Sequence, residues 1–383
     1  MTFEIATPAR IIFGEGKLGD VGALAAEMGA RALVVEGMSG RAEQVHEMLR
    51  AREITTTRVR VPGEPTTTLV EEAVAHARRE RCDLVIAFGG GSVIDAGKAI
   101  AALLTNRGEL LEYLEVVGKG RPITERAAPV IAIPTTAGTG AEVTRNAVLM
   151  VEDAHVKVSL RSPLMLPTVA LIDPTLTYTL PPALTASTGM DALTQCIEPF
   201  VSLRANPITD AVAREGMRRA ARSLRRAYQD GGDVDARRDM AVASLCGGLA
   251  LANAKLGAVH GFAAPLGGMF PIPHGTACAR LLAPVVAINI HALRERAPSS
   301  PALARYDDVA RILTGTPTAR AEDAATWLAE LVDALRIPSL GDYGITTSDV
   351  ARVVEPARRA SSMQGNPIVL TDDELAETLQ RAI

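Results

Sequence analysis

The sequence predicts an α/β domain with a mostly parallel sheet, followed by an all-helical domain. Short apolar runs alternate with helical patterns up to about residue 173, and only helical patterns follow. The chain has 383 residues, 48% of them hydrophobic, which is enough to bury two cores. We expect the first domain to cover residues 1–178 and the second to cover residues 179–383.

Three apolar runs in the first half are predicted to be buried strands: Arg31–Val35, Cys82–Phe88 and Pro129–Ile133. Between them, the segments Arg41–Arg52 and Thr67–Arg81 carry apolar residues at helical spacing, with charged residues on the opposite side. Strands that alternate with crossover helices form a parallel sheet with helices on both faces. A doubly wound domain is therefore expected.

The second half shows no alternating strand pattern beyond Pro174 and the Pro181-Pro182 turn. Four long segments have the period of an α-helix: Ala183–Val201, Thr209–Asp230, Ala236–Ala254 and Cys278–Arg296. Alanine-rich stretches within them favour close helix packing, so a helical domain is expected.

Composition narrows the classes of function. A net charge of -4, with 22% charged residues, leaves no basic excess for nucleic acid or an anionic membrane surface. The N-terminus lacks the pattern of a secretory signal, and no window approaches about 18 uninterrupted apolar residues, so a cytoplasmic protein is expected. The cysteines are far apart and lack C-x-x-C spacing, which predicts buried free thiols at Cys82, Cys196, Cys246 and Cys278, not a thiolate zinc site.

The first candidate site is the stretch FGGGSVIDAGK at residues 88–98, where a predicted strand runs into a predicted helix. Glycines let a backbone approach a ligand closely, and N–H groups at a helix start attract anions, so a pyrophosphate is expected here. A tight turn with Ser92 as N-cap explains one glycine but not three. The stretch matches neither G-x-G-x-x-G nor the P-loop, so it does not identify the nucleotide. The candidate cofactor-binding residues are Gly89, Gly90, Gly91, Ser92 and Asp95.

The stretch PTTAGTGAEVT at residues 134–144 follows the next predicted strand. Ligands of open α/β sheets bind outside the carboxyl ends of strands, so these hydroxyls and glycines are expected in the same cleft. A solvated turn is the alternative interpretation.

The helical half holds candidate metal ligands. Asp191 and Gln195 are four residues apart, hence on one helix face, inside an apolar segment. His260 and His274 lie in apolar, glycine-rich surroundings. Oxygen and imidazole donors that converge suit a divalent metal, whereas a core histidine or a helix-capping aspartate explains each of them singly.

Taken together, these stretches resemble the iron-containing (group III) alcohol dehydrogenases, whose relatives include glycerol dehydrogenases, maleylacetate reductases and, more remotely, dehydroquinate synthases. The resemblance covers nearly the whole chain and rests on FGEG, GGGSVIDAGKA, PTTAGTGAEVT, ALIDP, TGMDALTQCIE and GAVHGF…PLGG…PHG. It implies a dehydroquinate synthase-like fold, NAD or NADP in the cleft between the domains, a divalent metal that polarises the substrate alcohol or carbonyl, and a homodimer.

The resemblance also implies roles for single residues. Gly90, Gly91 and Ser92 correspond to the positions that hold the pyrophosphate. The nicotinamide side of the site corresponds to Thr135, Thr136 and Thr139, and Lys157 is expected to reach the cofactor. Asp191, His260 and His274 match three metal ligands and are the expected catalytic residues, with either histidine as proton donor where no metal is bound.

Two departures from the family pattern concern the metal. Gln195 stands where the pattern D-A-L-T-H has a histidine, and Ala264 replaces the second histidine of G-x-x-H. A carboxamide is a weaker donor than imidazole, so Fe²⁺ or Zn²⁺ is expected to bind Asp191, His260 and His274, with Gln195 as a weak fourth ligand.

The residue after the second strand predicts the cofactor, because an acidic side chain there accepts from both ribose hydroxyls and repels a 2′-phosphate. Gly37 occupies this position, and Ser39 and Arg41 follow as possible phosphate partners. NADPH is therefore expected to be accepted at least as well as NADH. Glu36, one residue earlier, could turn in and restore a preference for NAD.

The sequence thus predicts hydride transfer between NAD(P) and a small alcohol, aldehyde or ketone. One alternative is a maleylacetate-type keto-acid reductase that works without metal, with Arg145 and Arg161 available for an anionic substrate. The others are a dehydroquinate synthase-like lyase that uses the nicotinamide transiently, and a non-enzymatic nucleotide-binding homologue.

Overall fold

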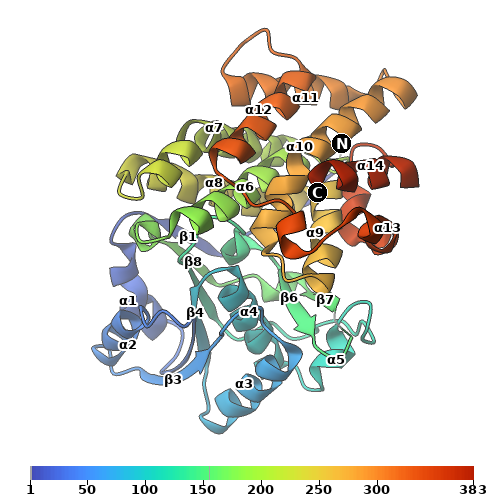
Figure 1. Cartoon of the computed structure of the whole chain (residues 1–383). Coiled ribbons are helices and arrows are strands. Elements are labelled where there is room, and N and C mark those ends of the chain that lie inside the picture. Colours follow the sequence, from blue (N-terminus) through green and yellow to red (C-terminus); the bar gives the residue numbers. More distant parts are fainter. Residues whose placement is uncertain (1, 155) are drawn as a thin grey trace. The chain divides into compact units, whose positions relative to one another are not determined.

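The computed structural model describes residues 2–154 and 156–383 (Figure 1). The chain forms two compact units, and each is described by itself. The sheet unit comprises Ala6–Thr136 and the described part of Gly140–Thr177. The helical unit comprises residues 2–5, residues 137–139 and Tyr178–Ile383.

The sheet unit is built on a parallel sheet with the strand order β1-β8-β5-β4-β2-β3 within the described residues. Its strands are β1 (Arg10–Phe13), β2 (Arg31–Glu36), β3 (Thr55–Arg60), β4 (Leu84–Gly89), β5 (Val130–Pro134) and β8 (Val169–Ile172). Strands β4 and β5 are buried along their whole length, as expected for apolar runs at the centre of a parallel sheet. The three predicted strands correspond to β2, β4 and β5.

Helices cover both faces of this sheet. Alternate residues of a strand point to opposite faces, so Val85 and Ala87 of β4 pack in one core and Ile86 and Phe88 in the other. The first core includes residues of α3 (Thr67–Arg79), α4 (Gly91–Thr105) and α5 (Leu110–Tyr113). The second includes residues of α1 (Val21–Ala26) and α2 (Glu43–Arg50). The predicted doubly wound arrangement is confirmed.

The strand predictions did not include β1, β3 and β8 of the main sheet, and they also missed a separate antiparallel pair. Strands β6 (Asn146–Val151) and β7 (Val156–Arg161) form an antiparallel pair outside the main sheet. Buried and partly buried residues alternate along β6, which is the signature of a strand with one covered face. Their inner side chains, such as Leu149 and Leu160, join the core that contains α4.

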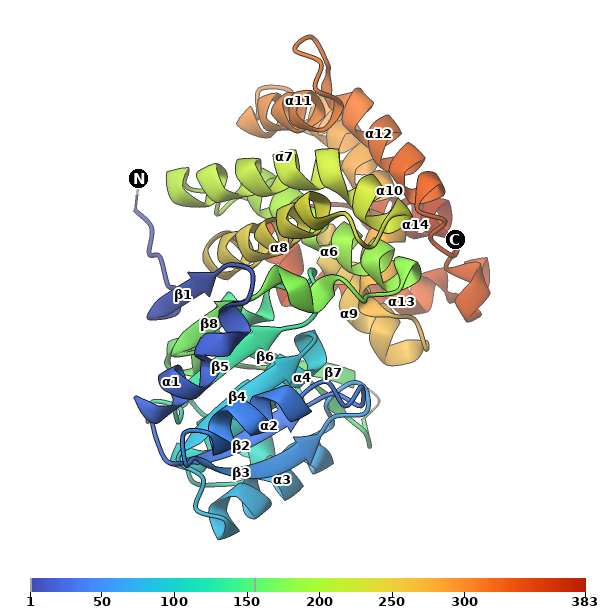
Figure 2. The same ribbon diagram turned by 90° about the vertical axis from the view of Figure 1, so that its left-hand side faces the viewer.

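The helical unit surrounds one apolar helix. Its helices are α6 (Pro182–Val201), α7 (Pro207–Gln229), α8 (Val234–Ala254), α9 (Ala258–Met269), α10 (His274–Arg296), α11 (Pro301–Thr314), α12 (Ala321–Ala334), α13 (Val350–Arg359) and α14 (Asp372–Ala382). Helix α10 packs against α6, α9, α11, α12 and α14 (Figure 2). It is long and apolar enough to match a membrane span in composition, but 72% of its apolar window is buried inside the structure. This helix is therefore the core of the unit.

The four predicted helical segments correspond to α6, α7, α8 and α10, and each helix begins slightly earlier than predicted. Pro182 and Pro207 occupy first-turn positions, where the missing N–H costs nothing. The Asp233 side chain accepts from the Ala236 N–H and so fixes the start of α8.

Candidate active site

The glycine-rich turn lies in the sheet unit where β4 ends and α4 begins. Gly90 is the N-cap of α4 and makes no side-chain capping hydrogen bond. A Cβ on Gly89 would lie 2.5 Å from Val93 Cγ2, so a side chain does not fit there. Ser92 lies inside the first turn and not at the N-cap, which removes the alternative of a serine-capped turn. A bare helix start beside a closely packed backbone suits an anionic group.

Thr135 and Thr136 follow β5, the neighbour of β4 in the sheet. The Thr135 N–H donates to the Gly89 carbonyl over 2.9 Å, and a Cβ on Gly90 would lie 3.5 Å from Thr136 Cγ2. The structure thus brings these two threonines to the glycine turn. Thr139 belongs to the helical unit.

Two further predicted cofactor residues already have partners inside the sheet unit. Asp95 Oδ2 accepts from the Val148 N–H over 2.9 Å, and Asp95 Oδ1 lies 2.9 Å from Lys98 Nζ. Lys157 Nζ lies 3.1 Å from Glu64 Oε1. Asp95 therefore ties α4 to β6, and any effect it has on a cofactor is indirect.

The loop after β2 carries Gly37, Ser39 and Arg41. Ser39 is exposed, and Arg41 donates from Nη1 to the Leu176 carbonyl over 2.8 Å. Burial lowers the pKa of Arg41. No acidic side chain stands at Gly37 itself, as the sequence showed.

Glu36, the residue that could restore a preference for NAD, is held in place. It is 2% exposed, and its carboxylate lies 3.1 Å from His46 Nε2, 3.2 Å from Arg58 Nε and 3.4 Å from Arg60 Nε. Separating a buried carboxylate from such partners costs a large free energy, so Glu36 is not free to turn toward a ribose.

In the helical unit, α6, α9 and α10 bring four side chains together: Asp191, His260, His274 and Cys278. One ligand atom from each lies within 4.8 Å of the other three. The first three were predicted from sequence, whereas Cys278 was expected to be an inert thiol. It is indeed a free, buried cysteine, yet its sulfur lies 3.9 Å from His260 Nε2 and 3.6 Å from His274 Nε2.

The start of α10 sets this geometry. His274 is the first residue of the helix and Cys278 follows one turn later on the same face. A Cβ on Gly275 would lie 2.5 Å from the Ser187 carbonyl oxygen of α6, so only glycine lets the two helices approach this closely. The signal in the sequence is the H-x-x-x-C spacing, whose meaning depends on this helix contact.

The cluster contains buried oxygen atoms that have no hydrogen-bond partner, namely Asp191 Oδ1 and Gln195 Oε1. An unsatisfied buried polar group costs about 1–3 kcal/mol. A cation among these donors would satisfy Asp191 Oδ1, and a carboxylate with two imidazoles is a donor set that suits Zn²⁺ or Fe²⁺. The residues present therefore fit a divalent metal.

Glu198 is a functional candidate that the sequence interpretation missed. Its Oε2 lies 2.6 Å from His260 Nδ1, and its Oε1 accepts from the Val259 N–H over 2.7 Å. The carboxylate fixes the ring of His260 so that Nε2 faces Asp191, 3.4 Å from Oδ1. Glu198 lies seven residues after Asp191 on α6, a spacing that places both on one helix face.

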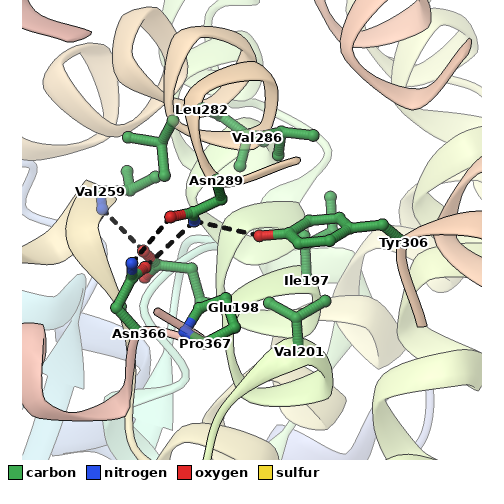
Figure 3. A pocket seen from close by; sticks show the side chains of 12 residues that line it. Ile197, Glu198, Val201, Val259, Leu282, Val286, Asn289, Tyr306, Asn366 and Pro367 are labelled. Carbon is green, nitrogen blue, oxygen red and sulfur yellow. Dashed lines mark hydrogen bonds between the residues drawn. The ribbon is translucent and has the colours of Figure 1, made fainter. Parts of the chain in front are cut away.

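A buried polar network lies next to Glu198 and lines the same pocket (Figure 3). The side chains of Asn289 and Asn366 hydrogen-bond each other over 2.7 and 3.1 Å, and Asn289 also donates to the Tyr306 hydroxyl over 3.0 Å. Asn366 Oδ1 accepts from the Ala258 N–H at the start of α9. This network fixes the helix start that carries His260.

The electrostatics of the cluster favour positive charge. Burial alone lowers the pKa of His260, but Cys278, Asp191 and Glu198 together raise it well above its ordinary value. The Cys278 sulfur, against the effect of burial and with help from Asp191, raises the pKa of His274 to about 9. Burial opposes ionisation of Asp191, yet the two histidines lower its net pKa. Negative groups that attract imidazolium protons also attract a metal cation.

Comparisons with known proteins identify the family of the chain. Residues 8–174 match the family described as iron-containing alcohol dehydrogenase, and residues 185–383 match the Fe-containing alcohol dehydrogenase family, C-terminal. The chain is 40% identical over 324 residues to alcohol dehydrogenase 4 of Schizosaccharomyces pombe, covering 84% of this chain and 74% of that protein. It is 38% identical over 328 residues to 1,3-propanediol dehydrogenase of Klebsiella pneumoniae, covering 84% and 81%. The crystal structure of a 1,3-propanediol oxidoreductase superposes with a TM-score of 0.93 at 35% identity, covering 100% of both chains.

Proposed function

This chain belongs to the iron-containing alcohol dehydrogenase family and is an oxidoreductase that acts on CH–OH groups, and from that premise we propose its cofactor, substrate class and site. It transfers a hydride between NAD(P) and a small alcohol, aldehyde or ketone, with NADP accepted at least as well as NAD. A divalent metal is held by Asp191, His260 and His274. The observation that carries the proposal is the unsatisfied buried oxygen of Asp191 beside two imidazoles.

The sheet unit supports the nucleotide part of the proposal. The turn at Gly90 gives a pyrophosphate close access to the backbone, and the N–H groups at the start of α4 attract its charge. Thr135 and Thr136 lie at the carboxyl end of the neighbouring strand, where their hydroxyls can donate to the cofactor.

The loop after β2 supports the use of NADP. Gly37 offers no carboxylate to repel a 2′-phosphate, and Glu36 is already paired. Arg58 and Arg60 on the adjacent strand β3, whose side chains are 38% and 55% exposed, neutralise the Glu36 carboxylate.

The helical unit supports the chemistry. A divalent cation at Asp191, His260 and His274 supplies Lewis-acid stabilisation of the charge that develops on a substrate oxygen. Glu198 keeps His260 in one orientation. Where no metal is bound, His274 is better placed than His260 to exchange a proton with a substrate, because its side chain is 37% exposed against 7%.

A substrate screen tests the proposal. Oxidation of NADPH and NADH is followed with aldehydes, ketones and keto acids, and the metal content of the same preparation is measured. We expect turnover with small aldehydes or ketones, and loss of turnover after chelation with nucleotide binding retained. Turnover of keto acids alone, unaffected by chelation, would instead identify a metal-independent keto-acid reductase.

Two variants separate the parts of the proposal. Gly91→Asp places a carboxylate at the proposed pyrophosphate site and is expected to abolish nucleotide binding while the protein stays folded. Arg41→Ala is expected to weaken NADPH use more than NADH use. A strong preference for NADH, with NADPH use unaltered in Arg41→Ala, contradicts the cofactor assignment.

A further inference from the structure

We propose that the sulfur of Cys278 is the fourth protein ligand of the metal site, in place of the carboxamide of Gln195, and that the site therefore selects Zn²⁺ over Fe²⁺. The inference rests on the metal site of the proposed function. It concerns the identity of the metal and of one ligand, which can be measured without any substrate.

The distances within the cluster match those between the ligands of one tetrahedral ion. With metal–nitrogen and metal–oxygen bonds of about 2.0–2.1 Å and a zinc–sulfur bond of about 2.3 Å, tetrahedral ligands lie about 3.3–3.4 Å apart for N and O and about 3.5–3.6 Å apart for S and N. Here Asp191 Oδ1 lies 3.4 Å from His260 Nε2 and 3.7 Å from His274 Nε2. Cys278 Sγ lies 3.9 Å and 3.6 Å from the same two nitrogens. Each separation is within a few tenths of an ångström of the tetrahedral value.

Cys278 is held in this position by the fold. It is fully buried on α10, one turn after His274, and α10 begins where Gly275 packs against α6. The polar neighbours of its sulfur are the Nε2 atoms of the two imidazoles. Within the part of the chain that the structure describes, no other cysteine belongs to such a group of possible ligands.

Gln195 is the competing donor, and it is the weaker one. Its carboxamide is neutral, whereas a thiolate brings a negative charge and a soft donor to a site that already holds one carboxylate and two imidazoles. Gln195 also hydrogen-bonds the Asp191 carboxylate, an interaction that lowers the pKa of that group. We therefore assign Gln195 to the support of a ligand and not to the ligand set.

A thiolate changes which metal is preferred. Thiolate donors suit Zn²⁺, and mixed sulfur and nitrogen ligands in tetrahedral arrangement are typical of zinc sites. Fe²⁺ lies below Zn²⁺ in the general affinity order for such donors. Because some zinc sites accept a fifth ligand, four protein ligands would not by themselves exclude a substrate oxygen.

Cobalt substitution tests the ligand. The metal-free full-length protein is loaded with one equivalent of Co²⁺, and its near-ultraviolet absorption is recorded. We expect a thiolate-to-cobalt charge-transfer band in the parent protein and in Cys246→Ser, because Cys246 is a buried cysteine of the same unit outside the cluster. The band should be lost in Cys278→Ser and Cys278→Ala and retained in Gln195→Ala. Bound cobalt without the band, or a band that survives both Cys278 variants, overturns the assignment.

Metal competition tests the selectivity. Metal-free protein is equilibrated anaerobically with equal concentrations of Zn²⁺ and Fe²⁺, and the bound metals are measured by mass spectrometry. We expect zinc to exceed iron at least tenfold, and this ratio to fall in Cys278→Ser but not in Cys246→Ser. Equal ratios in these two variants, or failure of the parent protein to bind either metal, overturns the proposal. If the cobalt-loaded protein shows the band and the zinc-loaded protein shows no NAD(P)H turnover, this inference stands and the proposed function is refuted.

Discussion

The two units each bury a cluster of charged side chains, and the clusters differ in how completely they are satisfied. In the sheet unit, Lys98 is fully buried and its Nζ has three partners: the Ala141 carbonyl at 2.9 Å, Thr144 Oγ1 at 3.0 Å and Asp95 Oδ1 at 2.9 Å. Those three partners match the three donors of an ammonium group. In the helical unit, Asp191 Oδ1 and Gln195 Oε1 have no hydrogen-bond partner.

This difference separates a structural cluster from a ligand site. A buried charge whose hydrogen bonds are all made fixes neighbouring segments, here α4, β6 and the turn at residues 141–144. A buried cluster with unsatisfied acceptors and several metal-binding side chains is stable only at a cost, which a cation can remove. The two clusters should therefore respond in opposite ways to mutation and to metal.

Lys98→Met is the change with the largest expected effect on stability. It leaves the partly buried Asp95 without its cation, and breaking a buried ion pair in this way typically costs about 3–5 kcal/mol. Chemical unfolding of the metal-free protein should show this loss, beside Lys119→Met as a control, since Lys119 is exposed and pairs only at the surface. A loss below about 1 kcal/mol would remove the distinction between the two clusters.

Glu142→Gln should change the pH dependence of stability. Burial raises the pKa of Glu142 from 4.5 to about 7. Because the folded state holds this proton more tightly than the unfolded state, its stabilising contribution is complete below about pH 4 and is lost as the pH rises to about 7. The free energy of unfolding of Glu142→Gln, relative to that of the parent protein, should therefore rise by on the order of 2 kcal/mol between pH 5 and pH 8. Chemical unfolding at pH 5 and pH 8 measures this difference. The control is Glu72→Gln at an exposed position, for which we expect no change in stability relative to the parent protein between the two pH values.

Glu198→Gln should weaken metal binding without removing a metal ligand. Glu198 accepts from both His260 Nδ1 and the Val259 N–H, and a carboxamide has only one oxygen for two donors. Loss of such a partner typically lowers metal affinity about 10–100-fold. Competition with a chromophoric chelator measures the affinity, and Glu377→Gln on the surface helix α14 is the control. Unchanged affinity would show that the Asn289–Asn366 network alone positions α9.

Part of this arrangement could be predicted from the sequence. The period of the apolar residues predicted β2, β4, β5 and six helices, because each pattern reports which face of an element is buried. Asp191, His260 and His274 could be named as ligands because their residue types and surroundings match a family pattern. Their convergence depends on how α6, α9 and α10 pack, which no local pattern contains.

The residues that were missed or misassigned show the same limit. Cys278 resembled any other cysteine in an apolar segment until Gly275 was found to bring α10 against α6. Asp95 lies in the glycine-rich motif, but its carboxylate faces Val148 and Lys98, and the former is more than 50 residues away in the sequence. Roles that depend on partners distant in sequence require the tertiary packing.

Asp191→Asn is expected to have the smallest effect on the stability of the metal-free protein, although it removes a metal ligand. The pKa of His274 is raised to about 9 by Cys278 foremost and by Asp191, and that of His260 is raised as well. The stabilisation from the protonated ring of His274 is therefore complete below about pH 6.5 and is lost as the pH rises through about 9. Above that pH the neutral His274 ring no longer needs a buried carboxylate, and an asparagine of the same shape avoids its desolvation. At pH 9.5 we expect the free energy of unfolding of the metal-free variant to lie within about 1 kcal/mol of the parent value, as for the exposed Asp333→Asn, while zinc no longer stabilises it. A loss as large as that of Lys98→Met would mean that Asp191 is structural and that the two clusters are alike.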